Sequence, residues 1–242
     1  MRYSAFHRLP GLLGPLARLE WGFLAGLALA TGALWGFMEV ADAVREGGTR
    51  SIDRSLLLAL RNPADPADPW GPRWFEEMMR DFTALGGMAV LTFFTAAAIG
   101  YLLLDGKRHA ALAVFIAVAG GQVLSTCLKL GFDRPRPDLV PHEALVMTAS
   151  FPSGHSMMAA VTYLTLGAML ARVGARLPHK VYVLALALLL TVTVGASRVY
   201  LGVHWPSDVI GGWAVGAGWA LLCWSAMRRL QRRGRIEAAP EA

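Results

Sequence analysis

Residues 86–128 read GGMAVLTFFTAAAIGYLLL, then DGKRH, then AALAVFIAVAGGQVLSTCL. Two uncharged runs of 19 residues therefore lie on either side of a short basic turn. An apolar helix crosses the hydrocarbon core of a bilayer in about 20 residues. The stretch predicts two transmembrane helices joined by a tight turn at one face of a membrane.

Similar uncharged runs recur along the rest of the chain. A soluble protein could bury one of them as a core helix, but six in 242 residues leave too little polar sequence to cover them. We therefore expect an all-α integral membrane protein, a single domain over 1–242 in which six transmembrane helices form one bundle. The expected spans are about 21–44, 86–104, 110–128, 155–171, 181–197 and 208–227.

The composition excludes two other classes of protein. With 55% apolar and 17% charged residues, the chain lacks the low hydrophobicity and high charge of a disordered protein. Its net charge of +6 would suit a nucleic-acid-binding protein, but the charges gather in clusters between the apolar runs. We expect contacts with membrane lipids and none with nucleic acid, and the oligomeric state stays open.

The basic residues predict the orientation of the helices. Lys and Arg are enriched in cytoplasmic loops. If both termini are cytoplasmic, the inner segments, including a basic tail at 228–242, hold 13 of the 23 basic residues and four of the 17 acidic ones. The first run continues well past Ala28-Leu29-Ala30, which has the form of a signal-peptidase site, so we expect an uncleaved span. The polar connections 129–154 and 197–208 then lie at the outer face of a bacterial inner membrane.

The segment 45–85, between the first two spans, is expected to lie at the outer membrane surface. It repeats apolar residues at helical spacing on both sides of a proline-rich break at 62–69. Amphipathic helices of this kind lie in the interface, with tryptophans at headgroup depth. They could form a lateral gate for a lipid or simply cap the bundle, and the sequence favours neither. The residues of the pattern are Ile52, Leu56, Leu60, Trp70, Trp74, Phe75, Met78, Met79 and Phe82.

Residues 129–137, after the third span, read KLGFDRPRP. Lys129 is at a helix end, and Arg136 lies between two prolines whose fixed backbone angles hold it on a preset path. Converging ammonium and guanidinium groups suit a phosphate, although this segment alone would more simply be a basic turn that binds headgroups. We interpret Arg134 either as a secondary phosphate or headgroup contact or as a plain surface residue.

Two further segments place histidines in the same outer layer. Residues 151–155, FPSGH, lead directly into the fourth span, where the Ser-Gly turn would present free N–H groups at the positive end of a helix dipole. Residues 197–208, SRVYLGVHWPSD, lead into the last span. Asp208 lies four residues after His204, close enough to accept a hydrogen bond from one imidazole nitrogen and leave the other as an oriented lone pair.

Together the three segments resemble the signature motifs of the type 2 phosphatidic acid phosphatase superfamily, lipid phosphatases related to vanadium haloperoxidases. The motifs are Lys, six residues, Arg-Pro; then Pro-Ser-Gly-His; then Ser-Arg, five residues, His, three residues, Asp. All eleven specified residues are present in order and at the family spacing. They are Lys129, Arg136, Pro137, Pro152, Ser153, Gly154, His155, Ser197, Arg198, His204 and Asp208.

The resemblance implies a role for most of these residues. His204 would attack phosphorus in line and form a phosphohistidine, while Asp208 holds its ring. His155 would protonate the leaving oxygen and then act as base on the hydrolytic water. The resemblance implies no metal and no other cofactor, because side chains supply the cations. The groups that would hold the phosphate oxygens belong to Lys129, Arg136, Ser153, Gly154 and Arg198.

The chain is therefore expected to be an enzyme that hydrolyses a lipid phosphomonoester or diphosphate at the outer face. Similar bacterial proteins suggest undecaprenyl diphosphate, phosphatidylglycerophosphate, phosphatidic acid or diacylglycerol diphosphate as the substrate. A lipid phosphotransferase would use the same motifs and differ only in its acceptor. A non-catalytic phospholipid transporter is the remaining alternative, but it would need charged residues through the depth of the bundle, and the span interiors carry almost none.

Overall fold

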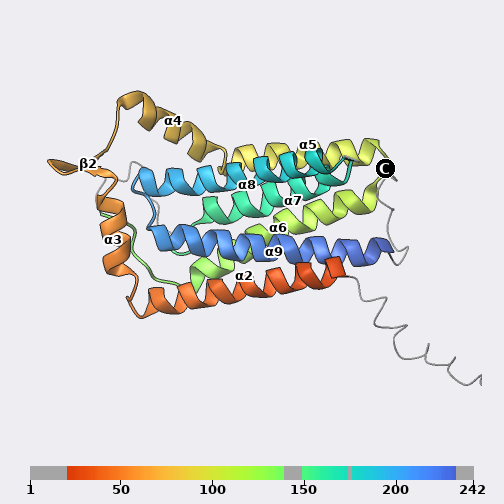
Figure 1. Cartoon of the computed structure of the whole chain (residues 1–242), viewed down its shortest axis with the longest axis horizontal. Coiled ribbons are helices and arrows are strands. Elements are labelled where there is room, and N and C mark those ends of the chain that lie inside the picture. Colours follow the sequence, from red (N-terminus) through yellow and green to blue (C-terminus); the bar gives the residue numbers. More distant parts are fainter. Residues whose placement is uncertain (1–20, 139–148, 174–175, 233–242) are drawn as a thin grey trace, which may run out of the picture.

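The computed structural model describes residues 21–138, 149–173 and 176–232, and these are mostly helical. The long helices run side by side in alternating directions and form one bundle (Figure 1). The last of them extends to Arg232, so the predicted basic tail at 228–242 is helical at its start, and residues 233–242 lie outside the described residues. The long helices are α2 (Trp21–Arg45), α5 (Met88–Leu104), α6 (Arg108–Leu130), α7 (Gly154–Val173), α8 (Leu177–Tyr200) and α9 (Pro206–Arg232).

Within the described residues, four helices are long and apolar enough to cross a membrane, namely α2, α6, α8 and α9. The helix α4 (Arg73–Ala84) and α5 add a fifth span if the pair, bent by 48° at its junction, crosses as one unit. The structure therefore supports an integral membrane protein with four or five of the six predicted spans. The helix α7 is not among them, and much of its surface is buried by its neighbours, including Met157, Ala159 and Val161.

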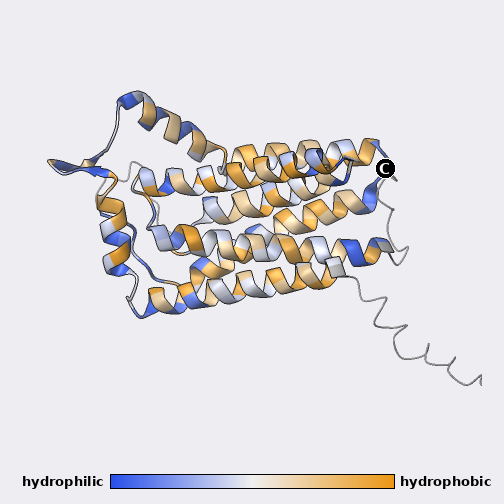
Figure 2. Ribbon diagram, viewed as in Figure 1, coloured by the Kyte–Doolittle hydropathy of each residue, from blue (hydrophilic) through white to orange (hydrophobic). Residues whose placement is uncertain are grey.

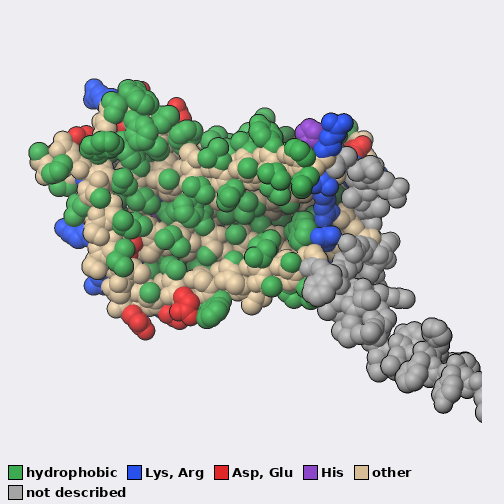
Figure 3. All heavy atoms as spheres, viewed as in Figure 1, with side chains coloured by type: hydrophobic (Ala, Val, Ile, Leu, Met, Phe, Trp, Pro, Cys, Tyr) green, Lys and Arg blue, Asp and Glu red, His purple; other side chains and the backbone are tan. Residues whose placement is uncertain are grey.

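The surface of the bundle is divided into an apolar belt and two polar ends. Apolar side chains cover the middle of the bundle, and charged side chains gather toward its ends (Figures 2 and 3). Leu29, Phe93, Leu104 and Leu189 are 61–91% exposed. So large an exposed apolar surface marks contact with a membrane or a partner, and its belt shape matches the hydrocarbon layer of a bilayer.

The three sequence motifs meet at one end of the bundle, where α6 ends and α7 and α9 begin. We call it the motif end, after Lys129, His155 and His204. The short helix α3 (Arg50–Leu58) lies across this end, and α4 flanks it (Figure 1). The polar segment between the first two long helices is thus placed beside the motifs.

A small hairpin occupies the expected proline-rich break between α3 and α4, in a structure that is otherwise mostly helical over its described residues. Strands β1 (Arg61–Asn62) and β2 (Asp65–Pro69) pair antiparallel. The Asn62 side chain accepts a hydrogen bond from the backbone of Ala64 at 3.1 Å, and Asp65 accepts one from Ala67 at 3.0 Å. Such turns reverse the chain locally in spite of the prolines.

Glycines allow α9 to pack closely against α2 and α7. A Cβ atom on Gly216 would lie 2.5 Å from the carbonyl oxygen of Met157, and one on Gly212 would lie 2.7 Å from that of Ser153. Gly26 of α2 faces Ser225 of α9 in the same way, at 2.7 Å from its Oγ. Gly212 and Gly216 are four residues apart, the small-xxx-small spacing that is typical of close helix contacts. Their contacts bring the start of α9 against the start of α7.

We predict that Gly216→Ala destabilises the protein, because the added methyl group meets backbone that cannot move aside. Overpacking of this kind costs about 1–3 kcal/mol. Gly36→Ala is the matched control, since its added methyl group would have no atom within 4 Å and alanine favours a helix. Thermal unfolding in detergent measures both, and equal melting temperatures for the two variants would contradict the packing argument.

Candidate active site

His204 is held in one orientation by a neighbour on each side of its ring. The residue lies just before α9 and is 1% exposed. Its Nδ1 atom is 3.3 Å from Oδ2 of Asp208 in the first turn of α9, and its Nε2 atom is 3.1 Å from a guanidinium nitrogen of Arg136. A carboxylate at Nδ1 favours the proton on that nitrogen, so the Nε2 lone pair faces Arg136.

The Asp208 carboxylate accepts hydrogen bonds from several segments of the chain. It is fully buried. Its Oδ1 accepts a hydrogen bond from Arg134 at 2.6 Å. Its Oδ2 accepts hydrogen bonds from the Trp205 backbone at 2.9 Å and from the Ser150 hydroxyl, in addition to the His204 contact. A buried carboxylate with this many donors stays ionised and fixed in place.

The surroundings of His204 keep its imidazole neutral. Burial lowers the pKa of His204 from 6.5 to about 4, against the hydrogen bond and charge of Asp208, which raise it. The positive charges of Arg198 and Arg136 contribute to this lowering. At neutral pH the ring therefore carries a free lone pair on Nε2, as a nucleophile requires.

Lys129 and the start of α7 meet at the same place. A Cβ atom on Gly154 would lie 3.4 Å from both Cε and Nζ of Lys129, so the ammonium group sits over the first residue of α7. The Ser153 hydroxyl oxygen accepts hydrogen bonds from Ser156, from its hydroxyl at 2.9 Å and from its backbone N–H at 3.4 Å, which caps the helix. An ammonium group and a helix N-terminus together suit an anion.

Arg198, near the end of α8, has one hydrogen-bond donor, its Nε–H group, that is not used within the described residues. One guanidinium nitrogen donates to Thr83 Oγ1 of α4 at 3.0 Å. The Nε atom is buried and has no hydrogen-bond partner among the described residues. An unpaired buried N–H is costly, and a phosphate oxygen would satisfy it.

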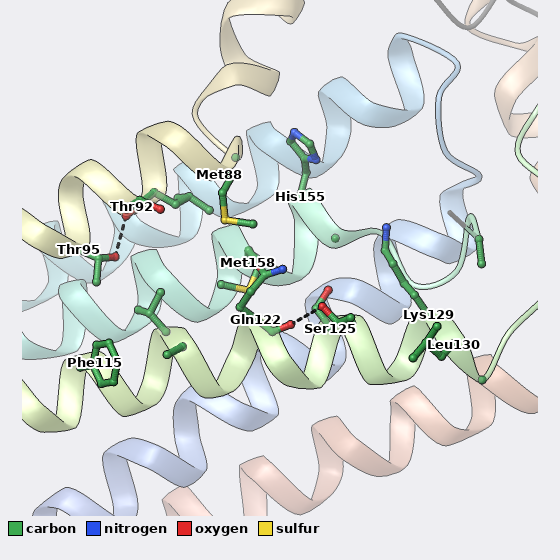
Figure 4. A pocket seen from close by; sticks show the side chains of 18 of the residues that line it. Met88, Thr92, Thr95, Phe115, Gln122, Ser125, Lys129, Leu130, His155 and Met158 are labelled. Carbon is green, nitrogen blue, oxygen red and sulfur yellow. Dashed lines mark hydrogen bonds between the residues drawn. The ribbon is translucent and has the colours of Figure 1, made fainter. Parts of the chain in front are cut away.

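A cavity of about 980 Å³ opens beside these groups. Lys129 and His155 lie at one end of it, and Phe115 and Thr95 lie toward the other (Figure 4). Its walls come mainly from α5, α6 and α7 and are largely apolar. A cavity of this size and character suits the apolar part of a lipid-sized ligand.

The described geometry thus brings most of the predicted residues together. Arg136, His204 and Asp208 are in direct contact, and Lys129, Gly154 and His155 line one cavity. Residues 110–232 match the family model of the PAP2 superfamily. The chain belongs to the PAP2 superfamily.

Two PAP2 relatives indicate which proteins this chain resembles. It is 32% identical over 189 residues to phosphatidylglycerophosphatase B of Bacillus subtilis (strain 168), across 74% of this chain and 85% of that protein. It is 33% identical over 154 residues to lipid A 1-phosphatase of Rhizobium etli, across 56% of this chain and 61% of that protein.

A solved structure has the same fold. The crystal structure of a transmembrane PAP2 type phosphatidylglycerolphosphate phosphatase from Bacillus subtilis superposes with a TM-score of 0.72 at 28% sequence identity. The match covers 84% of this chain and 98% of that chain. The likeness therefore extends well beyond the three motifs.

Arg134 has a different place in this PAP2 chain from the two roles interpreted from the sequence. Its side chain is 11% exposed, so it is not a plain surface residue. Its guanidinium group donates to Asp208, Asp53, Ser207 and Thr49, so its hydrogen bonds go to the protein and not to a phosphate. The plain surface role is therefore wrong, because the sequence of a basic turn shows its charge but not the buried carboxylates that it faces.

The sequence interpretation also missed three contributors to the site. Ser150 and Asp53 bond to the residues around His204, and Thr83 holds Arg198. Asp53 and Thr83 lie in the segment 45–85. In α3, the apolar pattern of Ile52 and Leu56 lies on the exposed face, opposite to Asp53. An acid within an amphipathic helix was the available signal for Asp53, and Ser150 gave none.

We predict that Gly86→Ala impairs catalysis. Its added Cβ atom would lie 2.4 Å from Cγ1 of Val194 and 3.3 Å from Cβ of His155. A displacement of His155 by a fraction of an ångström to 1 Å is expected to lower kcat by about 10- to 100-fold. Gly100→Ala in α5 is the control, since it meets no atom within 4 Å. Phosphate-release kinetics compare the two, and wild-type kcat for Gly86→Ala would contradict the placement of His155.

Proposed function

We propose that this PAP2 chain is a membrane lipid phosphatase that hydrolyses a lipid phosphomonoester or diphosphate through a phosphohistidine intermediate. One observation carries the proposal: a buried, neutral His204 presents Nε2 to the Arg136 guanidinium at the motif end, where Lys129 and His155 line a large apolar cavity. A phosphate bound at Arg136 would place its phosphorus within reach of the Nε2 lone pair.

The first half-reaction transfers the phosphoryl group to the protein. Nε2 of His204 attacks phosphorus in line and the bond to the lipid oxygen breaks. His155, which the negative charge of the bound phosphate would keep protonated, supplies the proton that this oxygen takes up. Asp208 stabilises the positive charge that develops on the imidazole. Charge on the three equatorial oxygens is held by the cationic groups of Lys129, Arg136 and Arg198, by the Ser153 hydroxyl and by the Gly154 N–H.

The second half-reaction returns His204 to its starting state. His155, now neutral, takes a proton from a water molecule, which attacks the phosphohistidine in line. The P–N bond breaks, and inorganic phosphate forms. Since Asp208 still holds Nδ1, the ring keeps its orientation through both steps.

The cavity supports a lipid as the leaving group. In-line displacement places the leaving oxygen opposite His204, on the side of His155. His155 lines the apolar cavity, so the lipid alcohol would leave into the bundle. The relatives named as phosphatidylglycerophosphatase B and lipid A 1-phosphatase favour phosphomonoesters of glycerophospholipids or of lipid A as the first substrates to test.

The charge distribution supports an active site at the outer face. The turn between α5 and α6 and the end of α9 lie away from the motif end and carry Lys107, Arg108, Arg228 and Arg229. Basic residues of short loops stay in the cytoplasm. We therefore place both termini inside and the motif end on the outer side of a bacterial inner membrane.

The test of the proposed function is phosphate release from a panel of lipid phosphates, in detergent with excess chelator. The panel holds phosphatidylglycerophosphate, phosphatidic acid, lipid A and undecaprenyl diphosphate. We predict release by the wild type and a loss of at least about 10⁴-fold in His204→Ala, because the nucleophile is gone. Retained activity in His204→Ala would overturn the mechanism, and label found on an added lipid acceptor would identify a phosphotransferase.

We also predict an acid limit set by His204. Activity should fall as the pH drops through about 4, because protonation removes the Nε2 lone pair. The charge of Arg136 lowers the pKa of His204, so Arg136→Gln should raise this pKa and move the acid limb of kcat/KM to higher pH. Rates between about pH 3 and 8 measure the limb in the free enzyme.

The control for the pH experiment is Arg108→Gln, which removes one positive charge at the opposite end of the bundle. Its acid limb should coincide with that of the wild type. An Arg136→Gln limb that stays in place or moves to lower pH would contradict the assignment of the acid limb to His204.

A further inference from the structure

The short helix α3 buries a carboxylate that the proposed mechanism does not use. Asp53 is 2% exposed, whereas the neighbouring Ile52 and Leu56 are 62% and 51% exposed. Removing a carboxylate from water is costly unless it is paired and hydrogen-bonded. A helix that only covered the bundle would need no acid on its buried side.

The partners of Asp53 all lie next to the proposed catalytic residues. Its Oδ2 accepts a hydrogen bond from a terminal nitrogen of Arg134 at 2.6 Å and one from the Ser207 hydroxyl at 2.6 Å. Its Oδ1 accepts the Ser207 backbone N–H at 2.9 Å. Ser207 directly precedes Asp208, so Asp53 holds the first turn of α9.

Arg134 joins Asp53 to Asp208. One of its terminal nitrogens donates to Asp53, and the other donates to Oδ1 of Asp208 at 2.6 Å and to the Ser207 hydroxyl at 2.7 Å. The opposite oxygen of Asp208 faces Nδ1 of His204. A continuous chain of charge-assisted hydrogen bonds, which are the strong ones, therefore runs from α3 to the imidazole.

We propose that Asp53 is a positioning residue, which through Arg134 and Ser207 fixes the Asp208 carboxylate that orients His204. The inference rests on the proposed function, because it requires His204 to be the reactive group. It gives the Asp53 side chain of α3 a role in positioning His204, although no atom of α3 needs to touch the substrate.

Two physical effects give Asp53 this role. The first is geometric: without Asp53, both terminal nitrogens of Arg134 could pair with Asp208 in the bidentate arrangement that guanidinium groups favour, which would draw Oδ2 away from His204. The adjoining cavity of about 680 Å³, which both Arg134 and Asp53 line, gives the released guanidinium room to move.

The second effect is electrostatic. With Asp53 present, one arginine is shared by two carboxylates, so Asp208 keeps much of its negative charge for the imidazole. With Asp53 neutral, the full charge of Arg134 falls on Asp208. The positive charge that develops on His204 would then be stabilised less. Because this charge is larger in the transition state than in the ground state, the transition state would lose more stabilisation.

The first test is Asp53→Asn, which keeps the shape and removes the charge. We expect kcat to fall by about 10- to 100-fold, the range seen when outer hydrogen-bond partners in active sites are removed. The KM is expected to change less than about twofold, since the phosphate-binding groups are untouched. Inhibition by vanadate, which mimics the transition state, should weaken by about the factor lost in kcat, and inhibition by inorganic phosphate should not.

Two more variants separate positioning from folding. Leu57→Ala removes the other fully buried side chain of α3 and should lower the melting temperature with kcat within about threefold of the wild type. Ser207→Ala removes the hydroxyl shared by Arg134 and Asp53 without leaving a charge unpaired. We expect it to lower kcat by about 3- to 10-fold at constant KM, and this variant gives the answer if Asp53→Asn does not fold.

A double-mutant cycle tests the route through Arg134. If Asp53 acts through Arg134, the kcat of the double variant should be within about twofold of that of Arg134→Gln alone. If the two residues acted independently, the fold losses in kcat of the two single variants would multiply. Effects that multiply in this cycle would overturn the inference. An unchanged kcat in a folded Asp53→Asn protein or in Ser207→Ala would overturn it as well. So would a kcat loss in Leu57→Ala as large as that in Asp53→Asn.

The same experiments include His204→Ala. An active His204→Ala protein would mean that the proposed function fails, and the inference with it. An inactive His204→Ala protein beside a fully active, folded Asp53→Asn protein would mean that only the inference fails.

Discussion

The arrangement of the motif end depends on the buried carboxylate of Asp208. Taken out of water, it must be matched by donors, and the chain supplies them from the loop after α6, the approach to α7 and the start of α9. Arg134, Ser150 and the Trp205 backbone N–H are these donors. Segments separated by more than 50 residues are thereby fixed around one group. The orientation of His204 follows from this, because its Nδ1 has the same carboxylate as partner.

The helix bundle provides the frame in which this constraint operates. Close glycine contacts set α9 against α7, so the first turn of α9 lies beside the first residues of α7. The apolar belt and the apolar cavity then lie next to the cationic side chains of the motif end. A phosphate ester of a lipid fits this division, because its two parts need opposite surroundings.

The segment 45–85 does more than cover the motif end. Asp53 joins the network around Asp208, and Thr83 holds Arg198. Gly86, directly after the segment, packs against His155. Its exposed apolar side chains, such as Trp70 and Trp74, remain free to meet lipid. The segment therefore links the membrane surface to the groups that act on the phosphate.

The membrane class, the helix bundle and the residues of the three motifs could be predicted from the sequence, because each depends on local features. Uncharged runs of about 20 residues indicate membrane helices, and polar residues at fixed spacing indicate the motifs. The sequence could not assign Arg134, whose partners are 81 and 74 residues away along the chain. It also could not show that α3 turns Asp53 inward and Ile52 outward, since an amphipathic pattern does not say which face meets the protein in a membrane. Only the tertiary structure decided these points, because a buried charge is defined by the groups that surround it and not by its neighbours in sequence.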